Sequence, residues 1–154
     1  KVSSIGSDFS NANIVQIYDS IYGNNTYLFG GKIQSNDGAG GIINYSSLVY
    51  TDNISTNISF SNADIDSNCY VMSLAFNGSS TFVAVTTTDS NYGPIFYTTN
   101  TSNWFSTNTL LYIPDWFNRP TVKWNGQNFI VANPLDTNTY YLASNPSNYI
   151  TLAT

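Results

Sequence analysis

The sequence lacks most of the residues with which enzymes carry out acid–base and nucleophilic chemistry. It contains no histidine, no glutamate, one cysteine and one arginine, and charged residues make up 8% of its 154 residues. Without histidine, neither a Ser-His-Asp triad nor a Cys-His pair can form. No pair of glutamates can act as acid and base, although pairs of aspartates remain possible. The sequence therefore predicts a protein that is not an enzyme.

Positive charge is scarce as well. Four Lys and Arg residues stand against nine Asp, which gives a formal net charge of -5. So few cations cannot form a basic surface that neutralises phosphates or anionic lipid headgroups. No apolar run approaches the ~18 residues of a membrane span. We therefore expect the protein neither to bind nucleic acid nor to insert into a membrane. A surface of Asn, Ser, Thr and Gly favours an extracellular location or the surface of a particle such as a virion.

The single cysteine, Cys69, excludes an intrachain disulfide and a cysteine-based metal cluster, and it is expected to be a small buried hydrophobic residue. The segment 64–68 begins like a calcium loop, with Asp64 and Asp66. It lacks the glycine and the closing acidic residue that such a loop needs. The sequence therefore predicts no metal site and no cofactor.

The residues that are present favour strands. Aromatic residues make up 16% of the chain. Val, Ile and Thr are plentiful, whereas the residues that favour helices, such as Glu, Lys, Arg, Leu and Ala, are scarce. An all-β fold with almost no helix is therefore expected.

A two-part pattern recurs three times, about 45 to 50 residues apart, as in proteins built from stacked units. Its first half is an aromatic residue, a small polar turn and an apolar run, at residues 22–29, 76–83 and 124–131. Its second half is a polar turn after an aromatic or apolar residue, at residues 50–57, 97–104 and 142–149. A unit of this length holds four short strands and must stack on its neighbours. The pattern predicts a single all-β domain, 1–154, with three propeller-like four-stranded units at approximately 14–58, 70–112 and 120–154.

Turn chemistry places the strands within these units. Asn77-Gly78 and Asn125-Gly126 each predict a hairpin turn. We expect polar loops at 86–93 and 133–138 and a glycine-rich excursion at 30–41. The strands expected around the second hairpin turn are 121–124 and 129–132.

One copy of the second half carries a family resemblance. The segment Tyr97-Thr98-Thr99-Asn100-Thr101-Ser102-Asn103-Trp104 resembles the Asp-box, or BNR repeat, of sialidase-like and photosystem-assembly-factor-like β-propellers. The resemblance implies a turn between the third and fourth strands of a blade, closed by a polar side chain, with the Trp packed between blades. An Asn can close such a turn as an Asp does. The residues at the Asp position are Asn53, Asn100 and Asn145.

The resemblance implies a fold and not an activity. Sialidase activity would need three arginines to grip a carboxylate, and Arg119 is the only arginine. The alignment of the repeats also predicts that Trp104 and Trp124 are buried and hold neighbouring units together.

Three units do not close a propeller, which needs at least four blades. The chain is therefore expected to be an incomplete propeller within a longer protein, or one that copies complete by self-association, or else a β-sandwich. We expect a non-enzymatic recognition module that binds a glycan or a protein surface. The alternative is a structural subunit of a capsid, fibre or extracellular filament that assembles through its sheet edges.

The segment 110–120 is the most unusual, because two prolines bracket aromatic residues and the only arginine. Such a mixture can stack on a sugar ring and bind its hydroxyls. In a blade, this loop lies on the same face as the loops 86–93 and 133–138. An alternative is that Trp116 and Phe117 fill the junction between units and that Arg119 pairs with Asp115. The candidate ligand-binding residues are Tyr92, Tyr112, Asp115, Trp116, Arg119 and Asp136.

Six Asn-x-Ser/Thr sequons are present, about as many as random placement of these residues gives. In a secreted protein each would be a possible N-glycosylation site. Turn chemistry alone would also place Asn and Ser at several of them. The sequons begin at Asn24, Asn44, Asn53, Asn57, Asn77 and Asn100.

Overall fold

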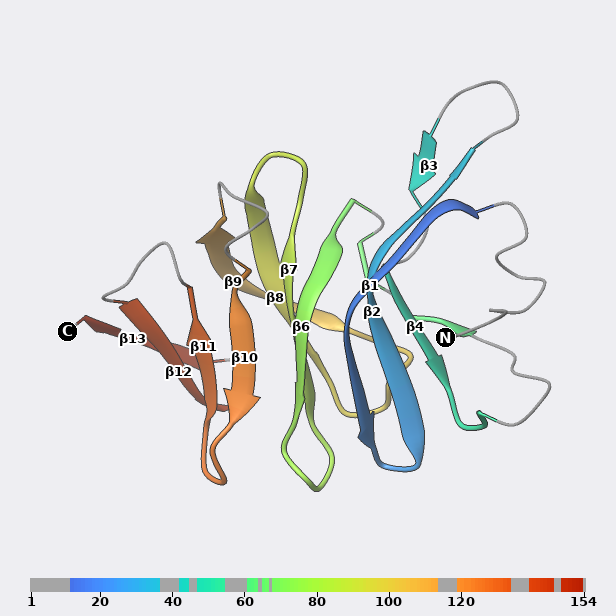
Figure 1. Ribbon diagram of the computed structural model, residues 1–154. Helices are drawn as coiled ribbons and strands as arrows, with labels where there is room; N and C mark the ends of the chain where they lie inside the picture. Colours follow the sequence, from blue (N-terminus) through green and yellow to red (C-terminus); the bar gives the residue numbers. More distant parts are fainter. Residues whose placement is uncertain are drawn as a thin grey trace.

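The computed structural model describes residues 12–36, 42–44, 47–54, 61–63, 65–66, 68–113, 119–133, 139–145 and 148–153. These residues form strands, turns and loops, and the strands make three antiparallel sheets that stand side by side (Figure 1). The all-β fold is thus confirmed, and the described strands form three sheets rather than the two of a sandwich. None of the described residues belongs to a helix, so none of them forms one that could cross a membrane.

The first sheet has the strand order β1-β2-β4-β5, and the short β3 pairs with the far end of β2. Its strands are β1 (Ala12–Gly23), β2 (Thr26–Asn36), β3 (Ile42–Asn44), β4 (Leu48–Thr51) and β5 (Ser61–Asn62).

The other two sheets have strands in simple sequential order. The middle sheet consists of β6 (Tyr70–Phe76), β7 (Phe82–Thr87), β8 (Tyr92–Thr98) and β9 (Phe105–Tyr112). The third sheet consists of β10 (Thr121–Trp124), β11 (Phe129–Ala132), β12 (Thr139–Asn145) and β13 (Asn148–Ala153).

Both predicted hairpin turns are present. Gly78 and Gly126 have φ angles of +81° and +98°, a region that glycine enters without strain. The side-chain oxygen of Asn77 accepts the backbone N–H groups of the residues that follow, at 2.9 to 3.0 Å from Ser79, Ser80 and Thr81. Asn125 closes the β10–β11 turn in the same way, at 2.9 Å from Gln127 and 2.7 Å from Asn128.

Two of the expected loops are shorter than predicted. The glycine-rich excursion predicted at 30–41 is wrong in its first part, because β2 continues through Asn36. Gly30 lies inside this strand, and glycine is required there because a Cβ would collide with the side chain of Val71 on β6. The loop expected at 86–93 covers only residues 88–91, because Thr86 is a buried strand residue whose hydroxyl donates to the Pro94 carbonyl at 2.6 Å.

The core consists of two layers, one on each face of the middle sheet. In β7, Phe82 and Ala84 belong to the cluster shared with the first sheet, whereas Val83 and Val85 belong to the cluster shared with the third sheet. Successive residues of a strand point to opposite faces, so an uninterrupted apolar strand indicates a sheet that is covered on both sides. Cys69 is 1% exposed and lies in the first of these clusters, as expected.

The two tryptophans differ in burial. Trp104 is 7% exposed, packs in the cluster between the first and middle sheets, and donates its indole N–H to the Thr101 carbonyl at 2.9 Å. Its predicted burial is confirmed. Trp124 is only partly buried, because it packs at the border of the second cluster, with its ring 4.8 Å from that of Phe129.

The first strands of the three sheets meet at one place, where β6 lies between β1 and β10 (Figure 1). The Ser73 hydroxyl on β6 donates to a carboxylate oxygen of Asp19 on β1 at 3.1 Å and accepts the backbone N–H of Val122 on β10 at 3.2 Å. The same oxygen of Asp19 accepts the backbone N–H of Leu74 at 2.8 Å. Ser73 therefore connects all three sheets.

Candidate functional site

The structure describes three of the six predicted ligand-binding residues, Tyr92, Tyr112 and Arg119; Asp115, Trp116 and Asp136 lie outside the described residues. Tyr92 and Tyr112 face each other across β8 and β9, with their ring centroids 4.8 Å apart. They are 48% and 50% exposed, so both rings are accessible to solvent.

Hydrogen bonds connect the loops around these tyrosines. The backbone N–H of Ile113 donates to the Asn91 carbonyl at 2.7 Å, and the side-chain amide of Asn133 donates to the Tyr112 carbonyl at 3.0 Å. The ends of β7, β9 and β11 therefore meet on one face of the molecule.

The predicted partner of Arg119, Asp115, lies outside the described residues, and the structure shows another contact of Arg119. Its guanidinium lies over the ring of Tyr18 on β1, 4.1 Å from the centroid, as a cation–π contact. The Tyr18 hydroxyl donates to the side-chain oxygen of Gln16 at 2.7 Å. Burial raises the pKa of Tyr18, and the positive charge of Arg119 opposes this shift. No local sequence pattern indicates this pair, because the two residues are distant in the chain.

The described sequons lie at several kinds of position. Asn24 and Asn77 are in hairpin turns and Asn53 and Asn100 follow β4 and β8, whereas Asn44 ends β3. Asn57 lies outside the described residues.

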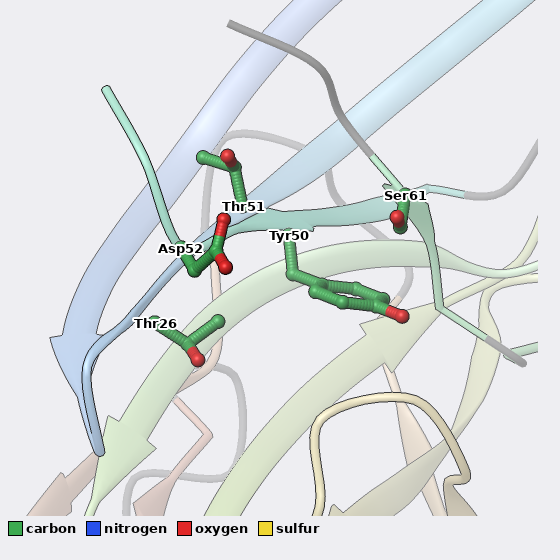
Figure 2. Close-up of a pocket in the computed structure, with 5 residues that line it drawn as sticks. All are labelled: Thr26, Tyr50, Thr51, Asp52 and Ser61. Atoms are coloured by element: carbon green, nitrogen blue, oxygen red, sulfur yellow. The ribbon is translucent and has the colours of Figure 1, made fainter. Parts of the chain in front are cut away.

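A pocket that the sequence analysis did not anticipate lies at one end of the first sheet (Figure 2). Its volume is about 250 Å³. Figure 2 shows the ring of Tyr50 extending across it, with Asp52 and Thr26 near one end of the ring and Ser61 near the other. The lining residues are Thr26, Tyr50, Thr51, Asp52 and Ser61.

Strand register explains why these side chains meet. Leu48, Tyr50 and Asp52 alternate along β4 and its continuation, so they point to the same face of the sheet. Leu48 is fully buried, Tyr50 packs against the edge of the core, and Asp52 is exposed. Tyr50 pairs with Ser61 on β5, which places the serine beside the ring. The pocket therefore begins where the core between the first and middle sheets ends.

The repeated sheets show what opens this pocket. Tyr97 of the middle sheet occupies the position of Tyr50, and its partner on the next strand is Phe105, whose ring lies 5.7 Å away. In the third sheet, Leu142 stands at the position of Tyr50, and its partner on the next strand is Ile150. The first sheet has Ser61 there. A small residue thus replaces a large one, and the space beside the aromatic ring is left open.

The turn that carries Asp52 shares one hydrogen bond with the corresponding turn of the middle sheet. The Thr51 hydroxyl accepts the backbone N–H of Asn53 at 3.1 Å and donates to its carbonyl at 2.9 Å. The Thr98 hydroxyl likewise accepts the backbone N–H of Asn100 at 3.2 Å. This local turn holds Asp52 at the mouth of the pocket.

No family model, curated protein or solved structure matches this chain. What the pocket can bind therefore has to be argued from its own chemistry. It offers one aromatic ring, the hydroxyls of Thr26 and Ser61, and one carboxylate. Among the described lining residues there is no second carboxylate that could serve as the partner of Asp52 in acid–base catalysis.

The sequence contains part of the evidence for this pocket, but comparison of the repeated segments does not include all of its residues. Asp52 stands where the other two copies of the pattern have Thr99 and Ser144. Ser61 follows the end of the repeated segment in its unit, so only the pairing of β4 with β5 shows that it corresponds to Phe105.

Proposed function

We propose that this chain is a non-enzymatic recognition module that binds a saccharide in the pocket of the first sheet. The observation that carries the proposal is the partly buried Tyr50 ring in the pocket lining, together with the carboxylate of Asp52 and three hydroxyl-bearing residues. An aromatic ring packs against the C–H face of a sugar, while polar side chains at its border bind the hydroxyls.

The size of the pocket favours a small unit of a glycan over a protein segment. Its volume of about 250 Å³ is below the ~300–1,000 Å³ that is typical of sites for drug-sized ligands. One face of Tyr50 packs against the core, so little side-chain freedom is lost on binding. A terminal sugar of an extracellular or particle-surface glycan fits these dimensions.

We also propose that the three sheets are blades of an incomplete or assembled propeller. The sequential strand order within the middle and third sheets supports this, as does the meeting of β1, β6 and β10 at one place. In such an array the pocket lies beside the β1–β2 hairpin, because Thr26 follows its turn. Figure 1 shows this hairpin at the opposite end of the array from the loop between β7 and β8, which Tyr92 follows.

Filling the pocket tests the saccharide proposal. The Ser61→Phe variant copies the natural arrangement of Phe105 beside Tyr97, so the sheet should accept it. A glycan array should first identify sugars that bind the parent protein. We expect Ser61→Phe to weaken that binding about tenfold or more, because the ring occupies the space of the ligand. Ser79→Phe makes the same change in the exposed β6–β7 turn and should bind like the parent.

Two results would refute the proposal. One is an array on which the parent protein binds no glycan. The other is a Ser61→Phe variant that keeps the parent's fold by circular dichroism and binds the same glycans with unchanged affinity.

A further inference from the structure

Asp52 is the charged group of the pocket. Its side chain is exposed, and no described residue donates a hydrogen bond to its carboxylate or forms an ion pair with it. The described lining residues include no Lys or Arg. The described cations have other positions: Lys32 lies over the ring of Tyr70, Arg119 lies over the ring of Tyr18, and Lys123 is exposed on β10.

The turn that follows β4 does not require a carboxylate at the position of Asp52. At the same position the middle sheet has Thr99, and its turn is closed by the same threonine hydroxyl contact. The first sheet thus differs from the repeated pattern at two residues, and both of them line the pocket. Ser61 opens a space, and Asp52 places a negative charge at its mouth.

Building on the saccharide function proposed above, we propose that the ligand carries a protonated amino group that binds Asp52, as in a hexosamine whose amine is not acetylated. The sugar ring stacks on Tyr50, and its ammonium group donates hydrogen bonds to the carboxylate. A hydrogen bond between charged partners is roughly twice as strong as one between neutral partners. A ligand with a carboxylate or sulfate group is disfavoured, because like charges repel and the net charge of the chain is already -5.

The test compares two ligands of the same sugar backbone, one with charged amines and one with neutral N-acetyl groups. A β-1,4-linked glucosamine trisaccharide with free amines and its N-acetylated counterpart are titrated into the isotope-labelled protein near pH 6, and binding is followed through the backbone amide signals of Thr26 and Asp52. We expect the free-amine trisaccharide to bind about threefold to fivefold more tightly, which is the range that an exposed ion pair provides. The preference should shrink in ~1 M salt, because exposed charges are screened.

Three variants test whether Asp52 and the pocket cause the preference for the free-amine trisaccharide. Asp52→Asn keeps the shape of the side chain and should make the two trisaccharides bind with equal affinity. Asp66→Asn removes one negative charge elsewhere on the exposed surface and should leave the preference intact. Ser61→Phe should abolish binding of both ligands at this site, which separates the pocket from general attraction of an amine to an acidic protein.

Equal affinity of the parent protein for both ligands, with both lost in Ser61→Phe, would overturn the amine proposal and leave saccharide binding standing. A preference that survives Asp52→Asn would also overturn it. If neither trisaccharide binds and the glycan array is empty, the saccharide function itself fails, and the amine proposal fails with it.

Discussion

Replacing Ser73 with alanine should destabilise the whole array, because its hydroxyl joins β1, β6 and β10. Val122 is fully buried, and in the variant its backbone N–H loses its acceptor. A buried donor without a partner costs about 1–3 kcal/mol. The carboxylate of Asp19 also loses one donor, although the backbone N–H of Leu74 remains. Together these changes should lower the free energy of unfolding by about 2–4 kcal/mol.

Urea unfolding followed by tryptophan fluorescence measures this change, and a cost of about 3 kcal/mol should lower Tm by roughly 6–12 °C in a chain of this length. Ser106→Ala is the matched control, since Ser106 is exposed on β9. It should unfold within about 0.5 kcal/mol of the parent. If Ser73→Ala also unfolds within that margin, Ser73 does not hold the sheets together.

Two further predictions concern buried side chains. Trp104→Ala should cost about 3–5 kcal/mol, as for a large aromatic residue in a core, and a denaturation midpoint equal to the parent's would contradict its place between the sheets. Burial raises the pKa of Cys69 to about 11, with a smaller contribution from Asp66, against a lowering by its hydrogen bond with Thr86. The folded protein therefore holds this proton longer than the unfolded chain, so stability should fall as the pH rises from about 8.5 toward 11. In Cys69→Ala, thermal melts over the same range should show a smaller fall.

Local chemistry made parts of the fold predictable from the sequence. The turns at Asn77-Gly78 and Asn125-Gly126 form through hydrogen bonds between residues that are close in the chain. The ranges expected for β10 and β11 agree with the structure for the same reason. The prediction of Gly30 as a loop residue is wrong, because the contact that requires a glycine there is with Val71 on another sheet.

The pocket could not be predicted, because it depends on which strands pair. Tyr50 and Asp52 stand in the repeated segment, but Ser61 comes after it, beyond a connection longer than the one that separates Tyr97 from Phe105. The contact of Arg119 with Tyr18 likewise depends on how β1 and β10 approach each other. Such approaches are set by the packing of whole sheets and not by neighbours in the chain.

The sequential order of the strands has a consequence for how this chain folds. In the middle and third sheets each strand pairs with the one that follows it in the chain, so most backbone pairing closes short loops. Short loops cost little entropy and form early.

The middle sheet buries apolar side chains on both faces, whereas each outer sheet shares a described core layer with the middle sheet alone. In a linear array with nearest-neighbour contacts, structure spreads from the most stable unit. We therefore expect the hairpin of β6 and β7 to form first, and the two outer sheets to order against it from the middle of the chain towards its ends.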